Sequence, residues 1–222
     1  MQHEQSVADA FRDYIREKAQ KFGTQVHSFS LDGQDRDAGA DYLFTDANRF
    51  AIVEFKYSES NLVSEKFKTR REKLCLMLEQ CIDMKSKHDQ CHFIAWTSGM
   101  SLAMRLNIYR HEICNQSVFG ATCGLSNNTP HTTDRVEANS FVKEFIEGTP
   151  PRSLSLRDFE IYLAWLLTDT SNSTNSTLEL LTRDPSSDNL SMVRLNSIAE
   201  AQTWLKKNFS STPTKPRKRT GP

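Results

Sequence analysis

The chain is poor in glycine and lacks the loops that hold nucleotides. Only 8 of its 222 residues are glycine, and no Gly-x-x-x-x-Gly-Lys-Ser/Thr sequence occurs. Such a loop cradles nucleotide phosphates with backbone N–H groups. The Gly-x-Ser-x-Gly turn that presents the nucleophile of many serine hydrolases is absent as well. The sequence therefore gives no support to a nucleotide-driven enzyme or to a serine hydrolase of that type.

The chain also has no excess charge, no long apolar run and no paired cysteine motif. The 28 basic residues balance the 28 acidic ones, so any nucleic-acid binding must come from local patches. No apolar run approaches the ~18 residues that span a membrane, and the polar start of the chain does not resemble a signal peptide. Five cysteines without Cys-x-x-Cys spacing favour reduced thiols. We therefore expect a soluble, cytoplasmic protein that makes no contact with membranes.

Two apolar runs joined by a polar turn carry two acids and a lysine. Residues 41–46 and 50–57 have the composition of the two strands of a hairpin. Glu54 and Lys56 are two positions apart, so they share one strand face while their apolar neighbours point to the other. Buried charges are costly unless they pair or bind something. Asp41 can meet Glu54 across the hairpin, and two converging carboxylates would form an oxygen site for a divalent cation.

An Asp, a hairpin and Glu-x-Lys on its second strand resemble the PD-(D/E)xK nuclease superfamily, which includes restriction endonucleases. The resemblance covers residues 4–97, with Ala40 in place of the proline that gives the family its name. It implies an α/β fold with a restriction-endonuclease-like core, a mixed β-sheet flanked by helices. It also implies a Mg²⁺-dependent deoxyribonuclease, with Mn²⁺ as a substitute. Such an enzyme hydrolyses DNA phosphodiester bonds in phage or mobile-element defence or in DNA repair.

The resemblance assigns roles to individual residues. Asp41, Glu54, Lys56 and Gln80 would form the catalytic group, with Glu4 on the first helix as a third metal ligand beside the two acids. Lys56 would orient the attacking water, so its replacement by alanine would abolish cleavage and leave folding largely intact. Gln80 matches only half of a family pattern, because the tyrosine expected four residues later is absent. The alternative for Glu4 is an acid that stabilises the positive end of a helix.

A cluster of cations follows the hairpin and is a candidate for DNA binding. Its members that we expect to contact phosphates are Lys66, Lys68, Arg70 and Arg71. Such contacts supply affinity without reading sequence. An equally good interpretation is an exposed helix face on which the cations are balanced by Glu65, Glu72 and Glu79.

The apolar pattern predicts three parts of the chain: residues 1–150 as the nuclease-like core, 151–209 as a C-terminal α+β extension, and 210–222 as a disordered basic tail. A buried strand over 91–97 is expected to run parallel to its neighbour after a helical crossover. The remaining helices are predicted over 4–22, from 63 or 69 to 87, and over 135–147, 156–168 and 197–208. Further strands are predicted over 24–31, 178–182 and 190–195.

Other functions remain open at this point. A nuclease-fold protein without catalysis would act as a DNA-binding or protein-interaction subunit, and an RNA-directed nuclease is a weaker alternative. DNA is the expected partner, and a protein partner or a homodimer is also compatible with the sequence. Zinc is a further alternative, because soft ligands lie close in sequence, although their spacing matches no standard finger. They are His88, Cys91, His92, His111 and Cys114.

Overall fold

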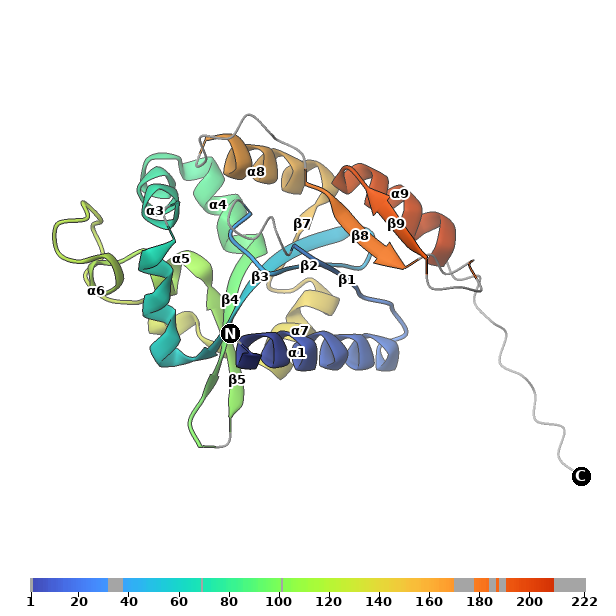
Figure 1. Cartoon of the computed structure of the whole chain (residues 1–222), viewed down its shortest axis with the longest axis horizontal. Helices are drawn as coiled ribbons and strands as arrows, with labels where there is room; N and C mark the ends of the chain where they lie inside the picture. Colours follow the sequence, from blue (N-terminus) through green and yellow to red (C-terminus); the bar gives the residue numbers. More distant parts are fainter. Residues whose placement is uncertain are drawn as a thin grey trace, which may run out of the picture.

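A mixed seven-stranded sheet forms the centre of the molecule, with helices on both faces (Figure 1). The computed structural model describes residues 2–31, 38–68, 70–100, 102–169, 178–183, 187 and 191–209. Six strands follow one another across the sheet: β1 His27–Ser30, β2 Tyr42–Thr45, β3 Arg49–Ser58, β4 His92–Ser98, β5 Ala103–Ile108 and β6 Val136–Glu137. A seventh strand, β7 Leu154–Ser155, pairs with the start of β3. An α/β protein with a mixed sheet flanked by helices, as predicted, is confirmed at this level.

The predicted hairpin and its parallel neighbour are both present. β2 and β3 are antiparallel, with Tyr42 opposite Val53, and β3 and β4 are parallel, with Val53 opposite Phe93. Side chains alternate along β3, so Val53 and Phe55 enter the core on one side of the sheet and Phe50 and Ile52 enter the core on the other. Glu54 and Lys56 follow the same alternation and lie on the face of Phe50 and Ile52.

One face of the sheet is covered by α1 Gln2–Lys21 and α7 Ala138–Glu147 (Figure 1). Phe11 of α1 packs on strands β2 and β3. Its ring centroid lies 5.4 Å from that of Phe44 and 5.5 Å from that of Phe55. Phe141 of α7 lies 4.9 Å from Phe93. Aromatic pairs of this kind add to the stabilisation that burial itself provides.

The other face is covered by α3 Arg71–Gln80, α4 Ile82–Cys91 and α8 Leu156–Thr168. A small sheet of β8 Leu180–Arg183 and β9 Met192–Leu195, with α9 Ile198–Phe209, adjoins α8 (Figure 1). One continuous apolar core joins these elements to the central sheet, and the Phe50 ring stacks on Phe159 at 5.6 Å. The extension predicted over 151–209 is thus packed on the core, and the tail predicted over 210–222 lies outside the described residues.

The single helix predicted up to residue 87 is wrong. The structure has a 3₁₀ helix, η1 Glu59–Phe67, followed by α3 and α4, which are separated at Cys81. Cys81 has an extended backbone, with φ −115° and ψ 95°. Apolar spacing continues across this residue, so periodicity alone did not reveal the break. No helix within the described part of the chain is both long and apolar enough to cross a membrane.

A disulfide corrects the prediction that all five cysteines are reduced. Cys75 in α3 is bonded to Cys114, which follows α5 Tyr109–Ile113. The two residues are 39 positions apart, and folding brings their Cα atoms to 5.1 Å. No local spacing marks such a pair, which explains why the sequence did not reveal it. Cys81, Cys91 and Cys123 carry free thiols.

We expect the Cys75–Cys114 bond to stabilise the fold by restricting the unfolded chain. For a loop of this length the chain-entropy model gives about 4 kcal/mol. Urea unfolding of Cys75→Ser should show a loss of this order, whereas Cys81→Ser, which removes a free thiol, should change little. Alkylation of the unfolded, non-reduced protein followed by mass spectrometry should label three cysteines; labelling of all five would contradict the pairing.

Candidate active site

Asp41 and Glu54 lie next to the last paired residues of two neighbouring strands. The register of β2 and β3 ends with Tyr42 opposite Val53, and Asp41 and Glu54 are the adjacent residues. The Asp41 N–H donates to the Val53 carbonyl over 3.0 Å, so the chain is still paired with β3 at this point. The charge of Glu54 contributes to raising the pKa of Asp41, so the two carboxylates are near each other.

The Asp41 carboxylate also completes the hydrogen bonding of β3. β2 begins at Tyr42, so the β3 backbone beyond Val53 has lost its strand partner on this side. Asp41 Oδ2 accepts from the Phe55 N–H over 2.7 Å. Burial, together with the charge of Glu54, raises the pKa of Asp41 to about 7, against the lowering effect of the Phe55 N–H and nearby ammonium groups. Two carboxylates so placed cannot both be ionised at low cost without a cation.

Lys56 lies between two buried carboxylates. Its Nζ is 2.5 Å from Glu54 Oε1 and 2.9 Å from Glu65 Oε1. All three side chains are almost wholly inaccessible to solvent. Burial opposes the charge of Lys56, but Glu54 and Glu65 outweigh that effect and raise the pKa of Lys56 well above its ordinary value. Lys56 is therefore a firmly protonated cation in this structure.

Glu65 is the centre of the charge network, and the sequence analysis missed this role. It is located on η1 with no exposed surface. Besides Lys56 and Lys68, it pairs with Arg71 Nε at 3.2 Å and accepts from the Tyr109 hydroxyl over 2.6 Å. Burial would raise the pKa of Glu65, but these cations and the Tyr109 hydrogen bond lower it far below the usual range. The sequence offered only its spacing from buried Leu62, three residues earlier, which is a weak signal.

The cations predicted to bind DNA do not form one exposed cluster. Arg71 is 1% exposed and turned toward Glu65, so it cannot contact a phosphate at the surface. Lys68 Nζ lies 2.5 Å from Glu54 Oε1 and 3.0 Å from Glu65 Oε1, with 29% of its side chain exposed. Lys66 is exposed and lies over the Phe67 ring, and Arg70 is partly exposed. Lys66 and Arg70 therefore keep the surface position that the prediction requires, whereas partly exposed Lys68 is engaged by the two acids and Arg71 is buried.

One oxygen of the network has no partner. Glu54 Oε1 is shared by the ammonium groups of Lys56 and Lys68, whereas Glu54 Oε2 is buried without a hydrogen bond in the described structure. An unpaired carboxylate oxygen near a second carboxylate suits a hard divalent cation, which takes oxygen ligands. The residues present therefore fit a Mg²⁺ ion held by Asp41 and Glu54. The ammonium of Lys68 neutralises Glu54 in the arrangement seen here.

Two other predicted site residues do not join the group of Asp41, Glu54 and Lys56. Glu4 is half-buried in the first turn of α1, and Glu4, Asp41 and Glu54 do not bring three ligand atoms within 4.8 Å of one another. Gln80 is exposed at the end of α3, and no hydrogen bond joins it to the acids among the described residues. The geometry thus supports Asp41, Glu54 and Lys56 as a group and leaves Glu4 and Gln80 outside it.

A histidine at the start of β4 supports the backbone that leads to Asp41. His92 Nε2 must donate to the Gly39 carbonyl, 2.8 Å away, because a carbonyl only accepts. Its Nδ1 then accepts from the Tyr162 hydroxyl of α8 over 2.7 Å. Gly39 has φ +73°, and a Cβ there would lie 2.8 Å from an Arg71 nitrogen. Both ring nitrogens of His92 are thus engaged and Cys114 is in a disulfide, so two of the soft ligands considered for zinc already have other partners.

Comparisons with family models, with curated proteins and with solved structures each gave no match.

Replacing Glu65 should destabilise the fold more than replacing an acid at the surface does. Glu65→Gln removes the negative charge that Lys56 and Arg71 share, although Lys56 keeps its contact with Glu54, and breaking a buried pair costs about 3–5 kcal/mol. Glu72→Gln, on the exposed side of α3, is the matched control and should stay within about 0.5 kcal/mol. Urea denaturation of both variants measures the difference. Equal stability of the two would show that Glu65 is not the centre of the network.

The raised pKa of Asp41 predicts a pH dependence with a definite sign. The ordinary value is 3.8, so between about pH 4 and 7 the folded protein holds a proton that the unfolded chain has released. This contribution to stability is complete below about pH 4 and is lost as the pH rises through about 7. Asp41→Asn should therefore be more favourable relative to wild type at about pH 8 than at about pH 4. Asp13→Asn, an exposed acid of α1, is the control; a pH-independent difference for Asp41→Asn would refute the assignment.

Proposed function

We propose that the protein is a metal-dependent phosphodiesterase that hydrolyses DNA, on a core related to the PD-(D/E)xK nucleases. One observation carries the proposal: Asp41 lies near Glu54 at the hairpin, Glu54 has an unpaired oxygen, and Lys56 contacts Glu54 from the same strand. The parallel pairing of β3 with β4 after helices α3 and α4 supports a restriction-endonuclease-like arrangement. DNA as the substrate, and a setting in defence or repair, rest on the resemblance of the motif.

The two carboxylates supply the ligands that this chemistry needs. Asp41 and Glu54 would hold a Mg²⁺ ion, which would supply a water of lowered pKa and a positive charge for a phosphate oxygen. Asp41 is fixed in position by the Phe55 N–H, and Glu54 by its place on β3. Rigid placement of ligands on strands favours catalysis because little reorganisation is needed in the transition state.

Lys56 acts in this scheme as a fixed positive charge and not as a base. Its carboxylate neighbours raise its pKa, so at neutral pH it has no lone pair with which to remove a proton. An ammonium can donate hydrogen bonds to a water or a phosphate oxygen and stabilise negative charge as it develops. Lys68, which is partly exposed, can leave Glu54 and turn to the phosphate when the carboxylate is occupied by a metal.

A second candidate function rests on the same network. Glu54 and Glu65 already have counter-charges within the protein, from Lys56, Lys68 and Arg71. A self-neutralised group of this kind needs no metal to be stable. It favours a nuclease-fold protein that acts as a DNA-binding or protein-interaction subunit without catalysis.

The test is cleavage of plasmid, linear duplex, single-stranded DNA and RNA with Mg²⁺, Mn²⁺ or a chelator. Glu54→Gln should lower the rate of DNA cleavage by roughly 100-fold or more, since metal-based charge stabilisation amounts to several kcal/mol. Glu72→Gln is the control, and we expect it to cleave DNA at the wild-type rate. Cleavage of RNA but not of DNA would show that the protein is a ribonuclease. No cleavage, together with no heat of Mg²⁺ binding in calorimetry, would support the non-catalytic subunit.

The structure also changes how Lys56 should be tested. Lys56→Ala would leave Glu54 and Glu65 buried without one of their counter-charges, and breaking a buried pair costs about 3–5 kcal/mol. The structure therefore leads us to expect a loss of stability in this variant, in contrast to the prediction from the sequence. Lys56→Arg preserves the charge and is the better variant, with circular dichroism as the check on folding. Loss of cleavage in a folded Lys56→Arg protein would show that the position of the ammonium matters as well as its charge.

A further inference from the structure

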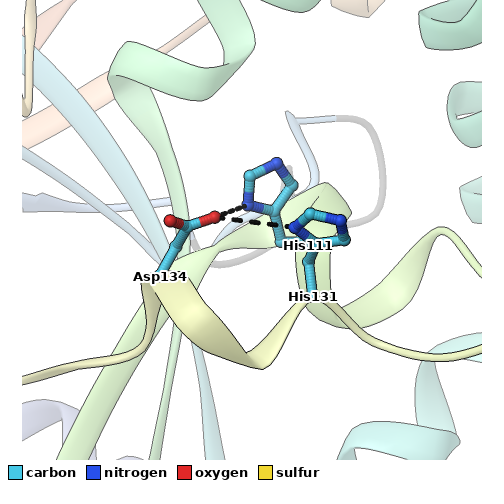
Figure 2. A group of neighbouring side chains, drawn as sticks. All are labelled: His111, His131 and Asp134. Atoms are coloured by element: carbon cyan, nitrogen blue, oxygen red, sulfur yellow. Dashed lines mark ion pairs between the residues drawn. The ribbon is translucent and has the colours of Figure 1, made fainter.

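Three side chains outside this network converge on one point at the surface. His111 belongs to α5. His131 directly precedes the short 3₁₀ helix η2 Thr132–Asp134, and Asp134 is the last residue of that helix. Figure 2 shows both imidazole rings turned toward the Asp134 carboxylate. Asp134 Oδ2 is 2.9 Å from His111 Nδ1 and 3.8 Å from His131 Nδ1. One ligand atom from each residue lies within 4.8 Å of the others, the only such three-residue group in the described chain.

A hydrogen bond does not explain this approach. His111 Nδ1 is buried and has no hydrogen-bond partner in the part of the chain that the structure describes, although Asp134 Oδ2 is within reach. The two atoms are close but not aligned for a proton between them. Ligands about 2.0–2.1 Å from a tetrahedral Zn²⁺ are separated from one another by about 3.4 Å. The distances of 2.9 Å and 3.8 Å to Asp134 lie on either side of that value.

The backbone around the three residues is held in place. The His131 N–H donates to the His111 carbonyl over 2.8 Å, and Asn107 Nδ2 donates to the His131 carbonyl over 2.8 Å. Arg135, next to Asp134, makes two hydrogen bonds of 2.7 and 2.8 Å to buried Glu112. The backbone that carries the three residues is thus held by contacts that do not use their ligand atoms.

We propose that His111, His131 and Asp134 form a binding site for a divalent transition metal, with Zn²⁺ as the best fit. Two imidazoles and one carboxylate are a ligand set of zinc sites that retain an open position, and imidazole ligands disfavour Mg²⁺ and Ca²⁺. The open position would face a cavity of about 490 Å³ that both histidines line. This site shares no residue with the group of Asp41, Glu54 and Lys56 and differs from it in ligand chemistry.

The charges around the cavity permit a cation. Arg110 also lines it, but two short contacts of 2.5 and 2.6 Å to the Asp89 carboxylate offset its charge. Lys85 and Glu79 line the cavity as well and are of opposite sign. The carboxylate of Asp134 thus provides the negative charge nearest to the two ring nitrogens.

Equilibrium dialysis of the full chain against ZnCl₂, with metal measured by mass spectrometry, tests the site. His131→Gln alters a side chain that is 64% exposed, so the variant should fold, and circular dichroism checks that it does. Its affinity for Zn²⁺ should fall by more than about 10-fold, the lower limit for changes that touch only the outer shell of a metal site. His3→Gln, an exposed histidine of α1, is the matched control and should bind as wild type does.

Two further measurements separate this site from the acidic group. Glu54→Gln should retain the histidine-dependent ion, and Asp134→Asn should lose it. Co²⁺ bound at the site should show a visible absorption band that His131→Gln removes. Wild-type affinity and stoichiometry in both His131→Gln and Asp134→Asn, or no Zn²⁺ bound by the wild-type chain, would overturn the proposal.

Discussion

The ion-pair network around Glu65 is the interaction on which the placement of the helices depends. A carboxylate with no exposed surface is tolerated only if cations and hydrogen bonds replace the lost water. Glu65 obtains them from three elements: Lys56 on β3, Arg71 on α3 and the Tyr109 hydroxyl on α5. Each of these side chains is itself buried. The charges therefore hold η1, α3 and α5 against the part of the sheet that carries Glu54 and Lys56.

Two further links act on the same elements. The disulfide joins Cys75, one helical turn after Arg71, to Cys114, just beyond the helix that carries Tyr109. The bond therefore ties together two of the partners of Glu65. On the other side, Gly39 passes so close to Arg71 that a side chain would clash, and His92 holds its carbonyl. In a chain with few glycines, this one is required by contact as well as by its positive φ.

Part of this structure was predictable from local pattern. Alternation on β3 places Glu54 and Lys56 on one face, and the apolar period over 156–168 gave the bounds of α8 as the structure has them. The rest depends on long-range contacts that leave no local trace. Glu65 reads as one of several acids in a charged stretch, and only the fold shows that it is buried. Arg71 and Lys68 belong to the same run of cations as Lys66, yet the first two turn inward and the last does not.

The same charges bear on whether a metal can bind between Asp41 and Glu54. In the structure, the ammonium of Lys68 neutralises Glu54, and the raised pKa of Asp41 allows a proton to neutralise Asp41. A divalent cation would have to displace both, so its binding should release a proton near neutral pH. The ammonium of Lys68 is partly exposed and can be hydrated when it leaves, which keeps the cost of the exchange low. Lys56, by contrast, is enclosed and stays. The network thus contains one enclosed charge, Lys56, and one charge that is partly open to solvent, Lys68.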